Sequence, residues 1–597
     1  WYSYAVASKS DVDSAVKLAK KAVTDWSAKG AEKRGEILKN FAQIAHDEQE
    51  SSIAIMARDA GKTVAEADPE VSEAIDFANY YALSAISLDL EKQSSPVGVV
   101  VVVPPWNFPY AIPTGGICAA LAAGNTVIFK SAPETVATSW HLVNQLWRSG
   151  VPKDVLQFVS TEDNEIGQAL ITHLDVNAVI LTGGYNTALL FSSWKNNLNL
   201  LAETSGKNSM VLTACCDIDL AVKDLVQSAF GHAGQKCSAA SVAIVDKNIY
   251  ENPIFKKQLL DAVQSLQVGA GYKYATSVGP IIKAAEHSLH RALTSLDEGE
   301  EWLLEPKQLD QAGLLWSPGI KTNVKPGSWS HLNEWFGPVL AIMISPDLKT
   351  SIKWQNATEF GLTAGIQSLD QGECEEWIEN VEAGNLYVNR GVTGAIVNRQ
   401  PFGGWKRSSV GATAKAGGAN YVATLRNWNQ MHHFLPMKEA ANKWLNAVGK
   451  LAIDKSGLEV ESNLQRYRNY KKGFLIRIES GTSKDELDFL SWLKTELGII
   501  TSLSSDTLIP GLANLVVESA SEFAEHAKEF DRARWLSSEI APIHQLMQNG
   551  VSCDMRPITS RGDIEMSRWF LEQSISITQH RYGNTNAGPK PICEGLK

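Results

Sequence analysis

The sequence predicts an α/β protein whose parallel sheets are covered by helices on both faces. Two observations support this prediction. First, the segments at residues 97–103 and 178–182 are almost uninterrupted apolar runs, as expected of strands that are buried on both faces. Second, such runs alternate with segments of helical periodicity, which is the pattern of β-α-β units. The chain has 597 residues, which is too long for one core, so we expect two to four domains.

The first half of the chain predicts helices followed by strand and helix alternation. The first helix repeats apolar residues from Val12 to Trp26 at helical spacing, and Ser10 with Asp13 would cap it. Two further helices are expected at 32–47 and 70–84. The alternation then runs through strands at 97–103, 126–130, 155–159 and 178–182, with helices at 112–123, 136–149 and 166–173. This arrangement commonly holds dinucleotides.

The second half predicts another α/β block and then a further small domain. The block covers about residues 209–389 and includes a strand at 240–245 and a helix at 255–265. Beyond about residue 425 we expect a polar helical stretch at 438–472. Strands at 474–478, 515–517 and 575–578 would then alternate with helices at 483–497 and 522–530. Ser483 and Glu486 have the spacing of a capping box. No catalytic cluster is evident in this last part.

Composition excludes several classes of function. The net charge of −11 and the pI near 5.7 argue against a general nucleic-acid or anionic-membrane surface. No apolar run approaches the ~20 residues that cross a bilayer. Seven scattered cysteines, an odd number, indicate reduced thiols and a cytoplasmic protein. His432 and His433 lack partners at ligand spacing, so we expect no metal site. Because the chain starts at Trp1, we also expect a fragment of a longer protein.

Three side chains together predict the oxidation of an aldehyde through a thioester. Cys237, in a Gly-Gln-Lys-Cys-Ser stretch, would attack the carbonyl carbon. The amide of Asn107 and the backbone N–H of Cys237 would stabilise the oxyanion. Glu203, placed after an apolar run, would stand at a strand end facing a cleft and activate water for hydrolysis.

Ordered sequence blocks add a resemblance to a known family. They are PWNFP at 105–109, GNTVIFK at 124–130, LTGG at 181–184, AETSGKN at 202–208, GQKCS at 234–238, EWFGPV at 334–339, NLYVNR at 385–390 and PFGG at 401–404. Together they resemble the aldehyde dehydrogenase superfamily over about residues 1–428. The spacing of 34 positions from Glu203 to Cys237 matches that family.

Within the superfamily the chain looks most like glutamate γ-semialdehyde (pyrroline-5-carboxylate) dehydrogenases. In particular it resembles that module of the bifunctional proline utilization A proteins. Gly394-Ala395 and the Lys-Ala-Gly-Gly stretch at 415–418 carry this likeness. So does the C-terminal stretch from Ser576 through His580 to Asn584.

The resemblance implies a fold and its domain boundaries. A Rossmann-like NAD-binding domain would cover residues 1–206 and an α/β catalytic domain residues 207–395. A return segment would follow at 396–430. A smaller, non-catalytic C-terminal α/β domain at 431–597 would cover part of the dehydrogenase or support a homo-oligomer.

The resemblance also implies the cofactor and its ligands. NAD is expected rather than NADP, held by Trp106, Lys130, Gly183, Gly184, Glu334 and Phe336. At two positions this chain departs from the residues usual in its relatives. Both departures weaken the choice of NAD over NADP from the sequence. Pro133 stands where NAD-preferring relatives often have Glu, and Tyr185 follows the glycines where Ser and Thr are usual. FAD would be involved only if a proline dehydrogenase domain precedes this chain.

The expected substrate is L-glutamate γ-semialdehyde. Ser238, Gly394 and Ala395 would anchor its α-carboxylate, and Phe108 and Phe402 would flank its stem. Ser205 and the segment 406–414 depart from the family pattern, which bears on the shape of the pocket. Two alternatives stay open. One is a dehydrogenase for another aldehyde, such as succinic semialdehyde, and the other is a catalytically silent scaffold. Proline dehydrogenase is the expected partner, as an upstream domain or a separate protein.

Overall fold

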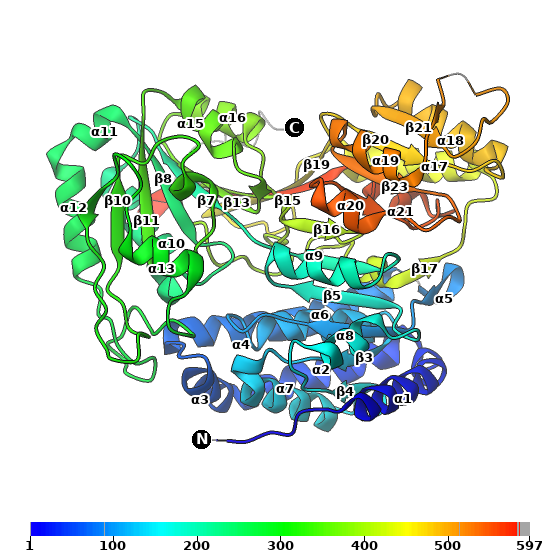
Figure 1. Cartoon of the computed structure of the whole chain (residues 1–597), viewed down its shortest axis with the longest axis horizontal. Coiled ribbons are helices and arrows are strands. Elements are labelled where there is room, and N and C mark those ends of the chain that lie inside the picture. Colours follow the sequence, from blue (N-terminus) through cyan, green and yellow to red (C-terminus); the bar gives the residue numbers. More distant parts are fainter. Residues whose placement is uncertain (1, 89, 513, 582–583, 586–597) are drawn as a thin grey trace.

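The computed structural model describes residues 2–88, 90–512, 514–581 and 584–585, and Figure 1 shows their arrangement. The N-terminal helices and a six-stranded sheet form one end of the molecule. A ten-stranded sheet with its helices lies beside the C-terminal region at the other end. No helix of these residues is both long and apolar enough to span a bilayer.

The six-stranded sheet has the strand order β16-β6-β5-β2-β3-β4, and only β16 is antiparallel to its neighbour. β2 is a run of five buried valines. Val100 and Val102 face the core shared with α2, α4 and α6, whereas Val99 and Val101 face α1. The predicted sheet buried on both faces is therefore confirmed. The strands are β2 (Val99–Val103), β3 (Thr126–Phe129), β4 (Leu156–Phe158), β5 (Ala178–Thr182), β6 (Leu200–Glu203) and β16 (Ser409–Gly411). The helices are α1 (Lys9–Ser27), α2 (Gly30–Asp47), α3 (Gln49–Asp59), α4 (Val64–Ser87), α6 (Ala111–Ala122), α7 (Val136–Arg148), α8 (Glu165–Thr172) and α9 (Tyr185–Trp194).

The start of α1 differs from the prediction by two residues. Ser8, not Ser10, is the N-cap, and its hydroxyl accepts a hydrogen bond from the backbone N–H of Asp11. The Asp11 carboxylate accepts the backbone N–H of Ser8 in return. Both serines precede an Asp by three residues, so spacing alone could not separate the two capping boxes.

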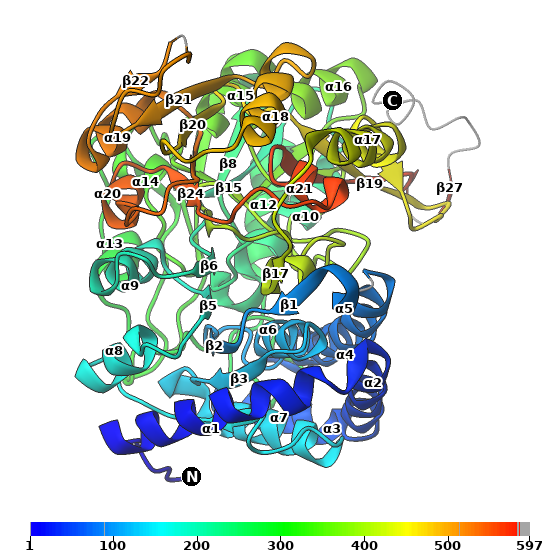
Figure 2. The ribbon, with the colours of Figure 1, turned by 90° about the vertical axis from the view of Figure 1, so that its right-hand side faces the viewer.

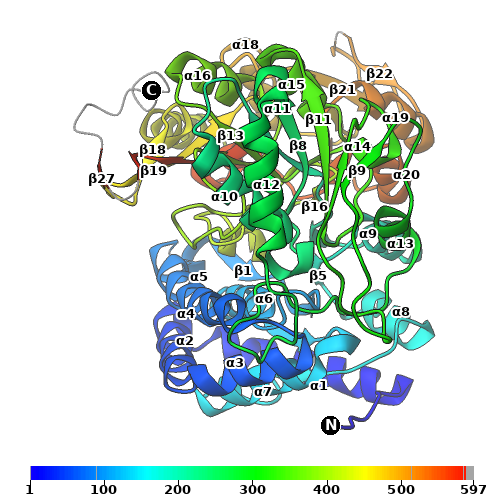
Figure 3. The ribbon, with the colours of Figure 1, turned by 90° about the vertical axis from the view of Figure 1, so that its left-hand side faces the viewer.

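The ten-stranded sheet forms the second body, with the order β18-β19-β25-β14-β13-β7-β8-β11-β10-β9. Figure 3 shows α10 and α12 in front of it. Its strands are β7 (Asn208–Leu212), β8 (Ala240–Asp246), β9 (Glu301–Leu304), β10 (Gly319–Thr322), β11 (Val339–Ser345), β13 (Thr363–Gln367), β14 (Asn385–Val388), β18 (Ile453–Asp454), β19 (Glu461–Arg468) and β25 (Leu571–Thr578). Its helices are α10 (Ile218–Phe230), α11 (Lys247–Glu251), α12 (Pro253–Gln264), α13 (His287–Thr294), α15 (Leu348–Asn356) and α16 (Gln371–Asn380).

Three strands of this sheet come from the C-terminal region, which corrects the expectation of one separate domain at 431–597. β25 pairs in parallel with β14, and β19 pairs with β25 along its whole length. The core that contains helices α10 and α12 also includes Leu464, Ile575 and Ile577. The stretch 438–472, expected as helix, is helical only in its first part and contains β18 and β19 in its second. β19 is rich in polar residues, so it lacks the apolar run that predicts a buried strand.

The rest of the C-terminal region forms a five-stranded parallel sheet in the order β22-β21-β20-β23-β24. Figure 2 shows this sheet on the side of the molecule opposite to the N-terminal helices. The Ser483 cap is confirmed, with Glu486 completing the box. Tyr582, Gly583 and Cys593 lie outside the described residues. The strands are β20 (Phe474–Arg477), β21 (Thr501–Ser505), β22 (Val516–Val517), β23 (Arg532–Trp535) and β24 (Ser552–Asp554). The helices are α17 (Phe434–Trp444), α18 (Lys484–Thr495), α19 (Ala520–His526), α20 (Ile543–Gln548) and α21 (Gly562–Ser567).

Candidate active site

The loop that carries Cys237 is tightly built. It follows α10 through a short turn (Gly231–Gly234) in which His232 and Ala233 have left-handed φ values of 54° and 51°. A Cβ on Gly234, whose φ is +68°, would lie 2.3 Å from the carbonyl oxygen of Gly337. Such backbone is costly for residues other than glycine and persists only where the surrounding structure fixes it.

Cys237 faces a cavity of about 310 Å³ that opens where the two large sheets meet. Thirteen of the fourteen predicted site residues line this one cavity. They are Cys237, Glu203, Asn107, Trp106, Gly183, Gly184, Glu334, Phe336, Phe108, Ser238, Gly394, Ala395 and Phe402. The structure thus brings them together, and their individual roles stay predictions.

Lys130 is the predicted residue that does not line the cavity. It follows the end of β3, and its Nζ lies 2.8 Å from the Oδ1 of Asp163. The side chain is buried, whereas Asp163 is largely exposed. A cofactor ribose would therefore have to reach Lys130 beside this ion pair.

Asn107 is held by a buried polar network. Its Nδ2 donates to the carbonyl oxygen of Gln235 at 3.0 Å, two residues before the nucleophile. Lys62 donates to the carbonyl oxygen of Asn107 at 2.9 Å and lies 2.6 Å from the carboxylate of Glu70. Because Lys62 and Glu70 are fully buried, their pairing fixes the Asn107 loop with little freedom.

Glu203 ends β6 and faces the cleft, as the sequence predicted. Its Oε2 accepts a hydrogen bond of 3.4 Å from the backbone N–H of Gly404. Burial raises the pKa of Glu203 to about 8, although the charge of nearby Lys415 acts in the opposite direction. Burial, assisted by the carboxylate of Glu334, also raises the pKa of the Cys237 thiol to about 12. At neutral pH both groups are therefore largely protonated in the free enzyme.

The side of the cleft predicted to hold the nicotinamide is lined by aromatic and acidic groups. Trp106 and Phe336 pack edge to face with ring centroids 5.7 Å apart, and Phe336 has a left-handed φ of 54°. The Oε1 of Glu334 accepts the backbone N–H of Gly206 at 3.1 Å. Gly184 caps the N-terminus of α9, and a Cβ on Gly183 would meet only Leu181, at 3.7 Å. A pyrophosphate fits this helix N-terminus because backbone N–H groups and open space coincide there.

The same cleft contains the residues of the predicted carboxylate anchor. Gly394 has a φ of +86°, and a Cβ at this position would meet no atom of the described residues within 4 Å, so its backbone is open to the cavity. Glu73 of α4 also lines the cavity and was not predicted from the sequence. Burial and the adjacent Glu70 raise the pKa of Glu73 to about 8. A charged residue between the apolar positions Val71, Ala74 and Phe77 is the signal that could have indicated it.

The fold and the site together define the class of protein. A thiol, a carboxyl group and an amide share one cleft between a dinucleotide-type sheet and a second α/β body, as in an aldehyde-oxidising enzyme. Comparison with known proteins agrees with this class. Residues 1–428 match the aldehyde dehydrogenase family, and the chain belongs to that family.

Similar proteins support the subfamily resemblance. The chain is 35% identical over 437 residues to a 1-pyrroline-5-carboxylate dehydrogenase of Staphylococcus saprophyticus, covering 70% of this chain and 84% of the relative. A 1-pyrroline-5-carboxylate dehydrogenase from Thermus, solved with bound NAD, has a TM-score of 0.66 at 31% identity over 71% of this chain and 85% of that one. Proline utilization A from Corynebacterium freiburgense has a TM-score of 0.86 at 39% identity. That match covers 98% of this chain, C-terminal region included, and 60% of the proline utilization A chain.

Proposed function

We propose that this chain oxidises L-glutamate γ-semialdehyde, the open form of pyrroline-5-carboxylate, to L-glutamate with NAD in proline catabolism. The observation that carries the proposal is the shared cleft in which Cys237, Glu203 and Asn107 meet Ser238 and Gly394. The names of the similar proteins support the same substrate.

Each step of the proposed oxidation can be assigned to side chains of the cleft. Once the Cys237 thiol has lost its proton to water of the open cleft, the thiolate adds to the aldehyde carbon, and the oxyanion accepts hydrogen bonds from the Asn107 amide and the Cys237 backbone N–H. The Asn107 amide has two N–H groups, so one can serve the oxyanion while the other stays on Gln235. NAD, when bound, supplies the hydride acceptor. Glu203 then takes a proton from water, whose oxygen attacks the thioester and releases glutamate and the thiolate.

The cleft also explains a preference for an amino-acid aldehyde. The hydroxyl of Ser238 and the backbone N–H groups at Gly394 and Ala395 suit a carboxylate, because they present partial positive charge with little reorganisation. Glu73 provides a carboxyl group in the same cavity for the α-ammonium group. Phe108 and Phe402 are placed to flank the aliphatic stem.

The choice of NAD rests on the NAD-bound Thermus relative and not on the residues after β3. Glu134 there is engaged by Lys283, with 2.5 Å between its Oε1 and the Nζ. A comparison of NAD and NADP at equal concentration tests this choice directly, and faster turnover with NADP would contradict it.

The proposed setting is the cytoplasm, with a proline dehydrogenase as upstream domain or separate partner. FAD would belong to that enzyme, and a homo-oligomer remains our expectation for this one. The six free cysteines among the described residues support a reducing compartment.

The substrate is tested by comparing kcat/KM for glutamate γ-semialdehyde and succinic semialdehyde, which lacks the amino group. We expect at least a tenfold preference for the former. Cys237→Ala should abolish NADH formation, whereas Cys215→Ala, at an exposed free thiol, should leave it unchanged. Equal kcat/KM for the two aldehydes would favour a dehydrogenase of another substrate. An inactive wild-type chain would favour the silent scaffold.

A further inference from the structure

Glu203 lines a second cavity, distinct from the cleft that holds Cys237. This cavity of about 110 Å³ lies between the dehydrogenase body and the C-terminal region. Thr413, Lys415 and Thr424 line it from the dehydrogenase, and Arg532, Arg568 and Glu572 line it from the C-terminal region. The general base proposed for hydrolysis thus faces two separate spaces.

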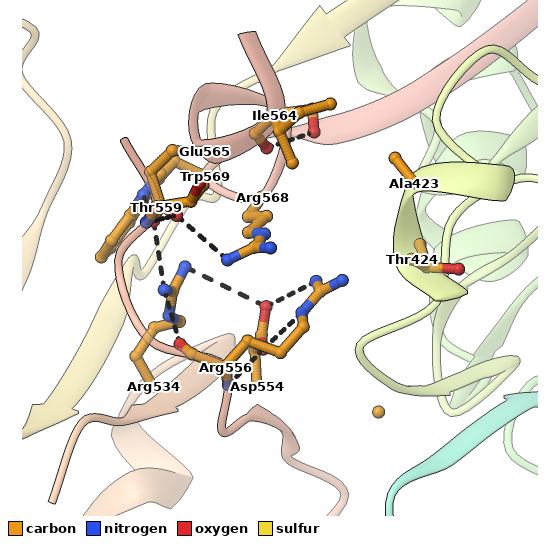
Figure 4. A network of polar contacts seen from close by, with 12 residues as sticks. Ala423, Thr424, Arg534, Asp554, Arg556, Thr559, Ile564, Glu565, Arg568 and Trp569 are labelled. Carbon is orange, nitrogen blue, oxygen red and sulfur yellow. Dashed lines mark hydrogen bonds and ion pairs between the residues drawn. The ribbon is translucent and has the colours of Figure 1, made fainter. Parts of the chain in front are cut away.

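The C-terminal wall of this cavity includes Arg556 and Arg568, which belong to a network of largely buried charges shown in Figure 4. Arg534 lies 3.1 Å from Glu565, and Arg556 lies 2.8 Å from Asp554. Arg568 donates from Nη1 to Glu565 at 3.1 Å. Arg556 and Arg568 face Ala423 and Thr424 across the cavity.

The donors on this wall indicate that the cavity is filled with water. Among the described residues, the buried Nε atoms of Arg532 and Arg568 have no hydrogen-bond acceptor. A buried guanidinium N–H without a partner is unfavourable, so water is the expected partner in a polar space of this size. The volume exceeds what a single water needs.

The cleft on the other side of Glu203 has a more apolar lining than this cavity. Its walls include the apolar side chains of Phe77, Val102 and Phe402. Substrate and cofactor would fill it during the reaction. Glu203 sits at the boundary, where Gly404 donates to its carboxylate and a Cβ on Gly403 would lie only 3.4 Å from its Oε1. A side chain larger than hydrogen at Gly403 would therefore contact the carboxylate of Glu203.

We propose that the hydrolytic water reaches Glu203 from this second cavity, and that the proton Glu203 accepts leaves through it, with Glu572 of β25 as the carboxylate acceptor. This rests on the proposed function. In the step, a water O–H bond breaks, the oxygen bonds to the thioester carbon and the proton passes to Glu203. The C–S bond then breaks, and the proton moves over cavity water toward Glu572.

Contacts of Glu572 fit this role. Its Oε2 accepts the backbone N–H of Lys415 at 3.1 Å, and its Oε1 accepts from the hydroxyl of Tyr467 at 3.4 Å. Lys415 donates from Nζ to the carbonyl oxygen of Gly403 at 2.6 Å, so it holds the wall between Glu203 and Glu572. A carboxylate from the last strand of the catalytic sheet thus reaches the neighbourhood of the base.

Filling the cavity tests the water route. Ser567→Leu would insert a larger side chain from the C-terminal wall, and Ser491→Leu, at an exposed serine of α18, is the matched control. Stopped-flow NADH formation reports addition and hydride transfer, and the steady state reports hydrolysis. We expect Ser567→Leu to keep the rate of the first turnover and to lower the steady-state rate at least fivefold, while Ser491→Leu changes neither.

A folded Ser567→Leu protein with an unchanged steady-state rate would overturn the proposal. Equal slowing of both phases would overturn it too, because a water route serves hydrolysis alone. The ratio of the steady-state rate to the first-turnover rate can be measured with any aldehyde that the wild type oxidises. A wrong assignment of the substrate would therefore not affect this test. A wild type that oxidises no aldehyde would instead refute the proposed function.

Substitution of Glu572 tests the proposed proton acceptor separately from the water route through the cavity. Glu572→Gln keeps the volume, and we expect a several-fold lower hydrolysis rate at pH 7 with an unchanged first turnover. Glu572→Asp should restore part of that rate. If Glu572→Gln hydrolyses the thioester as fast as wild type across the pH range, Glu572 is not the acceptor.

Discussion

The Nδ2 of Asn107 lies 3.0 Å from the carbonyl oxygen of Gln235 and so ties the segment between β2 and α6 to the loop that carries Cys237. These residues are 128 positions apart, and both are buried. The contact sets where an oxyanion would form relative to the amide donor.

Replacement of Asn107 by Ala is expected to lower kcat by about 10²–10³-fold, because one oxyanion donor is lost. KM should change little, since the ground-state carbonyl gains less from this donor than the oxyanion does. Steady-state NADH kinetics measure both quantities, and a thermal melt controls for folding. A loss below threefold in kcat would show that the amide does not serve the oxyanion.

The pH dependence of hydrolysis should report Glu203. Burial holds its pKa at about 8, so the fraction of carboxylate rises about tenfold per pH unit below that value and levels off above about pH 9. Decay of the acyl-enzyme after a single turnover, followed from pH 6 to 10, measures this limb. Glu203→Gln should give a slow and nearly flat profile. A wild-type inflection below pH 6 would contradict the assignment.

Breaking the buried charge network of the C-terminal region should lower the free energy of unfolding. Glu565 is fully buried between Arg534 and Arg568, so Glu565→Gln leaves both guanidinium groups without this carboxylate and should lower the free energy of unfolding by about 3–5 kcal/mol. Arg148→Met, which breaks an exposed pair with Glu48 of similar length, should cost less than about 1 kcal/mol. Denaturant titration of both variants measures the difference, and equal losses would refute the reasoning.

The same network predicts a loss of stability in acid. The buried arginines hold the pKa of Asp554 well below its usual range, chiefly through Arg556 and Arg534, which outweigh burial. A depressed carboxylate pKa stabilises the folded state above the unfolded pKa, and this contribution fades as the pH falls. Unfolding midpoints measured from pH 5 down to 2 should therefore decline less in Asp554→Asn, which has already lost this contribution.

Because β18, β19 and β25 of the C-terminal region belong to the ten-stranded sheet, we expect this region to be necessary for a stable dehydrogenase. Ile575 of β25 is fully buried in the catalytic core, so Ile575→Ala should cost about 2–5 kcal/mol. Ile540→Ala, at an exposed position of the same region, is the matched control and should cost little. A chain ending at residue 428 should expose the edge of β14 and aggregate. If it stayed soluble and fully active, the shared sheet would be dispensable.

Much of the fold was predictable where strands are apolar and helices are periodic. The valines of β2 and the Ser483 cap carry clear local signals, and both are present in the structure. β19 was not predictable, because its polar side chains are satisfied only by distant partners, as when Arg466 donates to Gln573. Its pairing is thus a property of the tertiary structure.

Some residues of the site could likewise be predicted from the sequence, and others could not. The grouping of Cys237, Glu203 and Asn107 followed from recognisable sequence blocks, and all three line one cleft. Glu73 stands between the apolar helix positions Val71, Ala74 and Phe77, a pattern that indicates burial, but only packing shows that it faces the cleft. The second cavity combines side chains from residues 203, 403–424 and 470–572, which no local pattern could bring together.

The placement of β25 next to β14 has a consequence for biosynthesis. A ribosome would release residues 385–388 long before residues 571–578, so β14 must wait with one edge unpaired while nearly two hundred further residues emerge. Late closure of this kind slows maturation and favours assistance by chaperones during translation.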